Sequence, residues 1–326
     1  MTNKLRTLFV IHGESIEEDI YSEDFEIETY SRCLKYIREN LLKSSLFKNI
    51  NIQIFVVEDN DINAHSRKLD DSEYVILLNR GLIQFAMETC GWDIDFLEEE
   101  LQYLGDKNDI MAFWILFTIY YFGGHEYGHI IDGHLEFSYN ATIDEKSPIT
   151  FFSMCELPSG LKDKPDVFRH LLELNADRYS SVFLAKSLWD LLLKFVIDKK
   201  KDELQTFESL IKLIVYIIYL THYKFGFFDI KTKDYPTHFF RAYSILNDFP
   251  RVMNSIIKEE YQHNVEKTVF NAMYTVFDYL ADHDEDFMSE INRDDIHSYN
   301  AEMSALYTKE QKLLNDFLKE YSLIKV

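Results

Sequence analysis

The chain has 326 residues, of which 34 are Lys or Arg and 56 are Asp or Glu, so its formal net charge is −22. Apolar residues make up 47% of the sequence and there are only 10 Gly and 5 Pro, a composition that excludes a disordered chain. Nucleic acids and anionic lipids attract basic surfaces, so the acidic balance disfavours both as partners. The sequence therefore predicts a globular protein of one or two domains with no nucleic-acid partner.

Cysteine usage and the apolar segments predict a cytoplasmic protein. The three cysteines, Cys33, Cys90 and Cys155, are widely spaced and form no C-x-x-C pair. The N-terminus lacks the long apolar stretch of a signal peptide. Two strongly apolar segments, 111–122 and 213–220, are shorter than the ~20 residues that a membrane-spanning helix needs. We expect both to be buried helices of a soluble protein.

The first third of the chain mixes strands with helices. β-branched and aromatic residues bounded by Asp and Asn predict strands, and spaced apolar residues predict helices. The expected elements are a strand at 8–11, a helix within 17–46, strands at 51–58 and 74–78, and a helix from 81 to about 104. The polar stretch 59–72 is expected to be a connection.

The rest of the chain is predicted to be helical. The apolar spacing gives helices at about 109–132, 166–199, 203–223, 236–247, 252–281 and 299–323. The stretch 136–165 contains three prolines and is expected to be a long loop near the functional site. The acidic stretch 282–300 is expected to be a hinge. The prediction is a mostly helical α+β fold with a small N-terminal sheet, a main domain at 1–250 and a helical extension at 251–326.

The motif that carries chemistry is His125-Glu126-Tyr127-Gly128-His129, an H-E-x-x-H. Residues four apart share one face of a helix, so both imidazoles can bind one cation. Glu126 is rotated by about 100° from His125 and can reach a water molecule beside the metal. Two ligands with an adjacent carboxylate are what a zinc hydrolase requires. Gly123 and Gly124 weaken the helix, which suggests a close approach of backbone or substrate.

A third ligand is predicted 44 residues after His129, at Glu173. Metzincins place a His six residues after the second His, where this chain has Leu135, so that class is disfavoured. Glu173 and Asp177 are four apart on a helix that Pro165 can begin. Glu173 can complete the metal site, and Asp177 can accept a hydrogen bond from a ligand His and fix its orientation.

Two further histidines lie near these motifs. His170 stands three residues before Glu173 and is an alternative third ligand. His134 follows the H-E-x-x-H helix at Gly133 and is expected to support the metal ligands from behind or to accompany the helix end.

The combination of H-E-x-x-H with E-x-x-A-D at 173–177 resembles the gluzincin metallopeptidases. The order of the motifs and the following Gly133-His134 resemble the HtpX/CAAX-prenyl-endopeptidase group and its soluble bacterial relatives. Asn63-Ala64, the strand at 74–78 and Gly81-Leu82 resemble the edge-strand region of that group. Pro236, five residues before Arg241, resembles its His-Pro…Arg element, although Tyr235 replaces the His.

The resemblance covers about 50–246 and leaves the C-terminal 80 residues unmatched. Related H-E-x-x-H sites occur in phage-exclusion Lit-type peptidases, a type similar to this chain in length, and in ImmA/IrrE-type regulators. The resemblance implies a zincin-like fold and Zn²⁺ held by His125, His129 and Glu173.

The resemblance also implies a mechanism and a substrate class. Glu126 would act as general base on a water molecule that attacks a peptide bond of a protein or peptide substrate. Tyr235, His238 and Arg241 are candidate donors to the tetrahedral intermediate, although each also fits a structural role. The substrate backbone is expected to pair with a free edge of the 74–78 strand. The alternative function is a regulatory or phage-defence protein that binds zinc for stability and hydrolyses nothing.

Overall fold

The structure is a computed structural model that describes residues 34–35, 50–136, 165–199, 202–227, 236–321 and 323. The expected strand at 8–11, nearly all of the expected helix within 17–46 and nearly all of the expected loop at 136–165 lie outside these residues.

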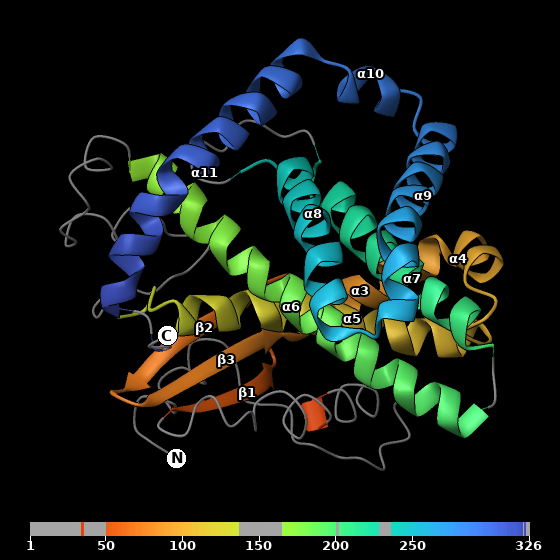
Figure 1. Ribbon diagram of the computed structural model, residues 1–326, viewed down its shortest axis with the longest axis horizontal. Helices are drawn as coiled ribbons and strands as arrows, with labels where there is room; N and C mark the ends of the chain where they lie inside the picture. Colours follow the sequence, from red (N-terminus) through yellow and green to blue (C-terminus); the bar gives the residue numbers. More distant parts are fainter. Residues whose placement is uncertain are drawn as a thin grey trace.

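The described residues form a small sheet and a larger set of helices (Figure 1). The elements are β1 (Asn51–Val57), β2 (Ala64–Asp70), β3 (Glu73–Asn79), α3 (Arg80–Trp92), α4 (Ile94–Glu100), α5 (Lys107–Ile131), α6 (Pro165–Lys199), α7 (Glu203–Lys224), α8 (His238–Ile256), α9 (Glu259–His283), α10 (Phe287–Ile291) and α11 (Asp294–Tyr321). The predicted mostly helical α+β fold with a small sheet is confirmed.

The sheet has the order β1-β3-β2, with β1 parallel and β2 antiparallel to β3. β3 therefore has a neighbour on each side, with Ile76 opposite Ile54 of β1 and Ser66 of β2. The expected free edge of the 74–78 strand is wrong, because the stretch read as a connection supplies β2. β2 is an outer strand of the described sheet, and it contacts α5.

β2 is a strand although its sequence, AHSRKLD, is mostly polar. Ala64 lies opposite Leu78 and belongs to the main core, whereas Leu69 packs with Val75 and Leu77 in a second cluster on the other face. The long side chain of Lys68 forms an ion pair with Glu136, with 2.6 Å between Nζ and Oε2. Pairing with β3 and burial on both faces outweigh the weak strand propensity of the sequence.

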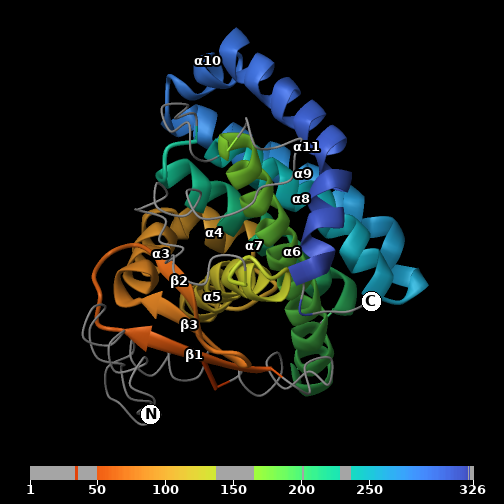
Figure 2. The same ribbon diagram turned by 90° about the vertical axis from the view of Figure 1, so that its left-hand side faces the viewer.

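α5 lies between the sheet and the other helices (Figures 1 and 2). Asp106 caps its N-terminus by accepting hydrogen bonds from the amides of Asn108 and Asp109. Nearly every residue from Ile110 to Ile131 is buried, because α5 contacts the sheet on one side and α3, α6 and α7 on others. This helix carries the H-E-x-x-H motif into the centre of the molecule.

α7 is the one described helix that is long and apolar enough to cross a membrane. Of its most apolar stretch of 18 residues, 78% is buried inside the protein. It contacts α3, α5, α6, α8 and α9. This burial is typical of the core helix of a soluble protein.

The C-terminal helices pack into the same hydrophobic core as the helices that precede them. Val265, Val269 and Val276 of α9 belong to the main hydrophobic cluster, and the predicted domain boundary after residue 250 falls inside α8. α8 runs through Pro250, which costs one helical hydrogen bond without ending the helix. α11 returns from α10 toward α5 (Figure 1), where the Leu323 amide donates to the carbonyl of Ile131 over 2.9 Å.

Candidate metal centre

Two glycines allow α5 and α6 to approach closely at the H-E-x-x-H motif. A Cβ on Gly128 would lie 2.8 Å from the Cα of Ala176, and a Cβ on Gly124 would lie 3.1 Å from the Cα of Ser180. Each glycine thus faces the backbone of α6, which explains the predicted close approach at Gly124. Gly123 faces only the Ile54 side chain at 3.8 Å. The contact brings the side chains of α6 up to the two histidines of α5.

Three buried side chains converge there and lie close enough to bind a metal ion: His125, His129 and Glu173. The Nε2 atoms of the two histidines are 3.1 Å apart. The carboxylate of Glu173 lies 3.2 Å from Nε2 of His125 and 3.7 Å from Nε2 of His129. In a tetrahedral zinc site with bonds of about 2.0–2.1 Å, neighbouring ligand atoms are about 3.3 Å apart. The three donors therefore fit a zinc ion.

The alternative third ligand, His170, lies on the preceding turn of α6. It is buried, but it does not belong to the group of converging donor atoms found among the described residues.

Asp177 and Arg241 support His125 from behind. Nδ1 of His125 lies 2.9 Å from Oδ1 of Asp177, and a carboxylate can only accept, so Nδ1 carries the proton and donates. In the neutral imidazole that a metal ion would require, Nε2 then has its lone pair directed at the other two ligand side chains. Arg241 donates through Nε and a terminal nitrogen to the two oxygens of Asp177, over 3.0 and 2.9 Å.

The buried charges of this site shift the pKa values of Glu173 and His125. Burial alone would raise the pKa of Glu173, but the nearby His129, His125 and Arg241 lower it to about 2. Burial alone would lower the pKa of His125, but hydrogen bonds to Asp177 and Glu173 raise it to about 10. The metal-free site thus holds a proton on His125 that a metal ion would displace.

His134 lies behind His129 and contacts its Nδ1. Its Nδ1 lies 2.7 Å from Nδ1 of His129, and its side chain is fully buried. The helix end folds it back: Gly133 has φ 75°, the Gly133 amide donates to the Ile130 carbonyl, and the His134 amide donates to the His129 carbonyl. This is a Schellman motif, which requires a residue such as glycine at the left-handed position. Burial holds the pKa of His134 well below its usual range, so a neutral imidazole faces His129.

Glu126 is buried beside the group, with 3% of its surface exposed. Burial lowers the pKa of His129, and the negative charges of Glu173 and Glu126 oppose that shift. Glu126 is therefore close to the ligands without being one of the three converging donors.

Of the three residues predicted to donate hydrogen bonds to the tetrahedral intermediate, the structure describes two, and these have different partners. Arg241 is buried and its guanidinium binds Asp177, so it acts behind His125. His238 begins α8, with Nδ1 3.0 Å from Nδ1 of His222. Tyr235 lies outside the described residues.

Two features near the metal-ligand residues were not predicted from the sequence: His222 and the contacts of Asp132. His222 is buried in α7, and its Nε2 lies 2.7 Å from the Tyr121 hydroxyl. Asp132, which follows α5, accepts hydrogen bonds from the Tyr179 hydroxyl at 2.6 Å and from the amide of Asn175. A helix-end Asp and a His within an apolar helix gave no signal, because their partners are distant in sequence.

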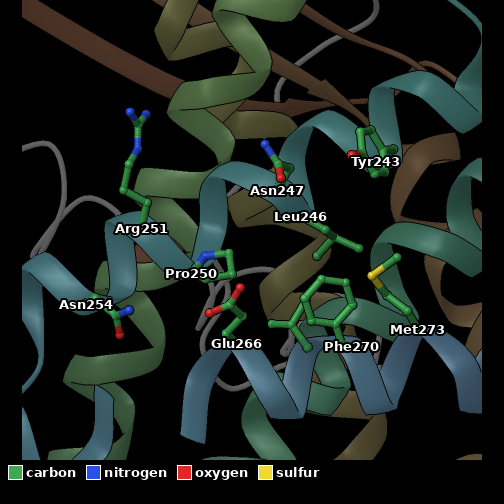
Figure 3. A pocket seen from close by; sticks show the side chains of 10 residues that line it. Tyr243, Leu246, Asn247, Pro250, Arg251, Asn254, Glu266, Phe270 and Met273 are labelled. Carbon is green, nitrogen blue, oxygen red and sulfur yellow. The ribbon is translucent and has the colours of Figure 1, made fainter. Parts of the chain in front are cut away.

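A groove of about 410 Å³ lies apart from this group, between α8 and α9 (Figure 3). Leu246, Phe270 and Met273 provide apolar surface, and Arg251 and Glu266 provide charge. It is lined by none of the converging metal-ligand candidates.

Comparisons with known proteins found no similar protein: no family model, no curated protein and no solved structure matches the chain.

Proposed function

We propose that this chain is a soluble, cytoplasmic, zinc-dependent endopeptidase that hydrolyses a peptide bond in a protein substrate. The observation that carries the proposal is the convergence of His125, His129 and Glu173 beside the buried carboxylate of Glu126. Two imidazoles and one carboxylate, with no fourth protein ligand among the described residues, are typical of catalytic zinc sites. The resemblance to gluzincin peptidases, and to the Lit type among them, supports the same function.

Zinc suits the donor set better than the harder cations do. Imidazole nitrogen is a common zinc ligand, whereas Mg²⁺ and Ca²⁺ prefer oxygen ligands throughout. When bound, zinc would polarise the scissile carbonyl and lower the pKa of a water molecule toward ~7.

The residues of the chain would hold the ligands and move protons. Asp177 accepts from Nδ1 of His125, and Nδ1 of His134 would accept from Nδ1 of His129 once Nε2 of His129 binds a metal. Glu126 would accept a proton from the attacking water at its carboxylate and deliver it to the nitrogen of the leaving amine. Arg241 would keep Asp177 ionised, since the pKa of that carboxyl is held well below its usual range, against burial, by Arg241 and His125.

The outer edge of β2 is the candidate binding edge for the substrate backbone. β2 contacts α5, and Lys68 of β2 pairs with Glu136, two residues after His134. An extended peptide could add to this edge as a further strand, with main-chain hydrogen bonds giving affinity.

The test compares the full-length chain with Glu126→Gln and Glu173→Ala, after chelation and reloading with zinc. Metal analysis should give about one zinc per chain for the wild type and Glu126→Gln, and much less for Glu173→Ala. Cleavage of denatured casein should require zinc and Glu126. Hydrolysis that survives in Glu126→Gln would contradict the proposed base, and zinc retained in Glu173→Ala would point to another third ligand.

The alternative, a regulatory protein that binds zinc for stability, has its own outcome in this experiment. If this alternative holds, we expect one zinc per chain, higher thermal stability with zinc, and no difference between the wild type and Glu126→Gln in any cleavage assay.

A further inference from the structure

Phe122 is a partly exposed residue on the buried part of α5, close to the candidate metal ligands in sequence. From Trp114 to Ile131 every residue of α5 is buried except Phe122, which is partly exposed. It stands one turn before Glu126 and three residues before His125, so these side chains lie on neighbouring parts of one helix face. An accessible side chain at this position is adjacent to the proposed reaction.

Two partly exposed rings from other parts of the chain join Phe122. Phe225, directly after α7, meets Phe122 edge to face with 6.2 Å between the ring centroids. The imidazole of His238, the first residue of α8, lies 5.4 Å from the Phe225 ring at an angle of 33°. Residues far apart in the sequence thus bring three partly exposed rings together.

The positions of these rings are fixed from behind. Phe85 of α3 is buried and stacks on Phe225, with centroids 4.9 Å apart and planes 14° apart. His222 holds the other side of His238 through the 3.0 Å contact between their Nδ1 atoms. A preformed aromatic surface binds a further apolar group without the cost of ordering its own side chains.

We propose that Phe122, Phe225 and His238 form the substrate-binding surface that selects a large apolar side chain, preferably aromatic, next to the scissile bond. This inference rests on the proposed function, since it places the surface beside Glu126. Partly exposed rings offer faces and edges on which a substrate ring can pack at the usual centroid distances.

The test measures binding of two zinc-chelating probes to the zinc-loaded, full-length chain by calorimetry. The probes are N-acetyl-L-phenylalanine hydroxamate and N-acetyl-L-alanine hydroxamate, which share the chelating group and differ in the side chain. We expect the phenylalanine probe to bind about tenfold more tightly. In Phe225→Ala this preference should fall to about twofold, with unchanged affinity for the alanine probe.

Two variants complete the design. Phe225→Leu keeps apolar bulk and should retain part of the preference, which separates loss of the surface from loss of the fold. Phe270→Ala removes a phenylalanine that is 51% exposed in the α8–α9 groove and should keep the full preference. Equal affinities for both probes in the wild type, or an unchanged preference in Phe225→Ala, would overturn this inference alone. Absence of binding for both probes would overturn the proposed metal centre, and this inference with it.

Discussion

Gly128 faces the backbone of Ala176 so closely that a Cβ on the glycine would lie 2.8 Å from the Cα of the alanine. Gly128 lies between Glu126 and His129 on α5, and Ala176 lies between Glu173 and Asp177 on α6. Small residues at this crossing therefore set the distance between the two motifs. The same contact explains why Gly128 and Ala176 are small residues, although neither takes part in the proposed chemistry.

Gly128→Ala should destabilise the protein and weaken zinc binding. Overpacking against a backbone costs about 1–3 kcal/mol, which exceeds the gain of up to about 1 kcal/mol in helix propensity. Displacement of α6 would also move Glu173 from the histidines. Urea unfolding and zinc titration measure the two effects. The matched control is Gly91→Ala in α3, where a Cβ meets nothing within 4 Å; equal behaviour of both variants would contradict the packing argument.

The helical part of the candidate site was predictable from the sequence because it depends on local periodicity. Spacings of four place His125 with His129 and Glu173 with Asp177 on shared faces, and the structure brings these faces together. β2 was missed for the opposite reason: its polar residues become a strand only through pairing with β3. The end of α8 was placed too early: the apolar spacing predicted a helix at 236–247, whereas α8 continues through Pro250 to Ile256.

The position of Arg241 could not be predicted from the sequence. It follows Asp177 by 64 residues, and only the packing of α6 against α8 brings their side chains together. The motif suggested a donor near the substrate, whereas the folded chain uses the guanidinium to hold Asp177.

Arg241→Met should cost about 3 kcal/mol of unfolding free energy, because it removes the guanidinium that binds both oxygens of the buried Asp177 and leaves the carboxylate with His125 as its cationic partner. The metal-free protein is the right sample for urea unfolding, since zinc would add its own stabilisation. Arg251→Met is the matched control: it lies on the same helix, its side chain is 68% exposed, and it pairs with Asp248. That substitution should cost less than about 1 kcal/mol. Similar losses in the two variants would show that burial of the Asp177 pair has no special weight.

His134→Ala should weaken zinc binding by about 10- to 100-fold, because His129 loses the acceptor that fixes its tautomer. His134→Asn should recover part of the affinity, since the amide oxygen can accept from Nδ1 of His129. Competition with a zinc chelator measures both values. His263→Ala, which removes an exposed His on α9, should leave zinc binding unchanged. Full affinity in His134→Ala would assign this side chain to the helix end alone.

Asp132 should make the stability of the metal-free protein fall as the pH rises from about 4 to 6. Burial raises the pKa of Asp132 to about 6, although Tyr179 and Arg178 oppose the shift. Between the unfolded pKa and the folded pKa, the native state binds more protons than the unfolded state, so the free energy of unfolding decreases with pH. The stabilisation is complete below about pH 4 and is lost as the pH passes 6.

Asp132→Asn isolates this contribution from the other carboxylates. The amide oxygen can still accept from the Tyr179 hydroxyl, whose bond to Asp132 is 2.6 Å long, but the variant has no proton to lose. The difference in unfolding free energy, variant minus wild type, should therefore rise by about 1–2 kcal/mol between pH 4 and 7, a value reduced for partial exposure. Urea unfolding at several pH values in the presence of a chelator measures it. A difference that is independent of pH would mean that Asp132 titrates as an ordinary surface carboxylate.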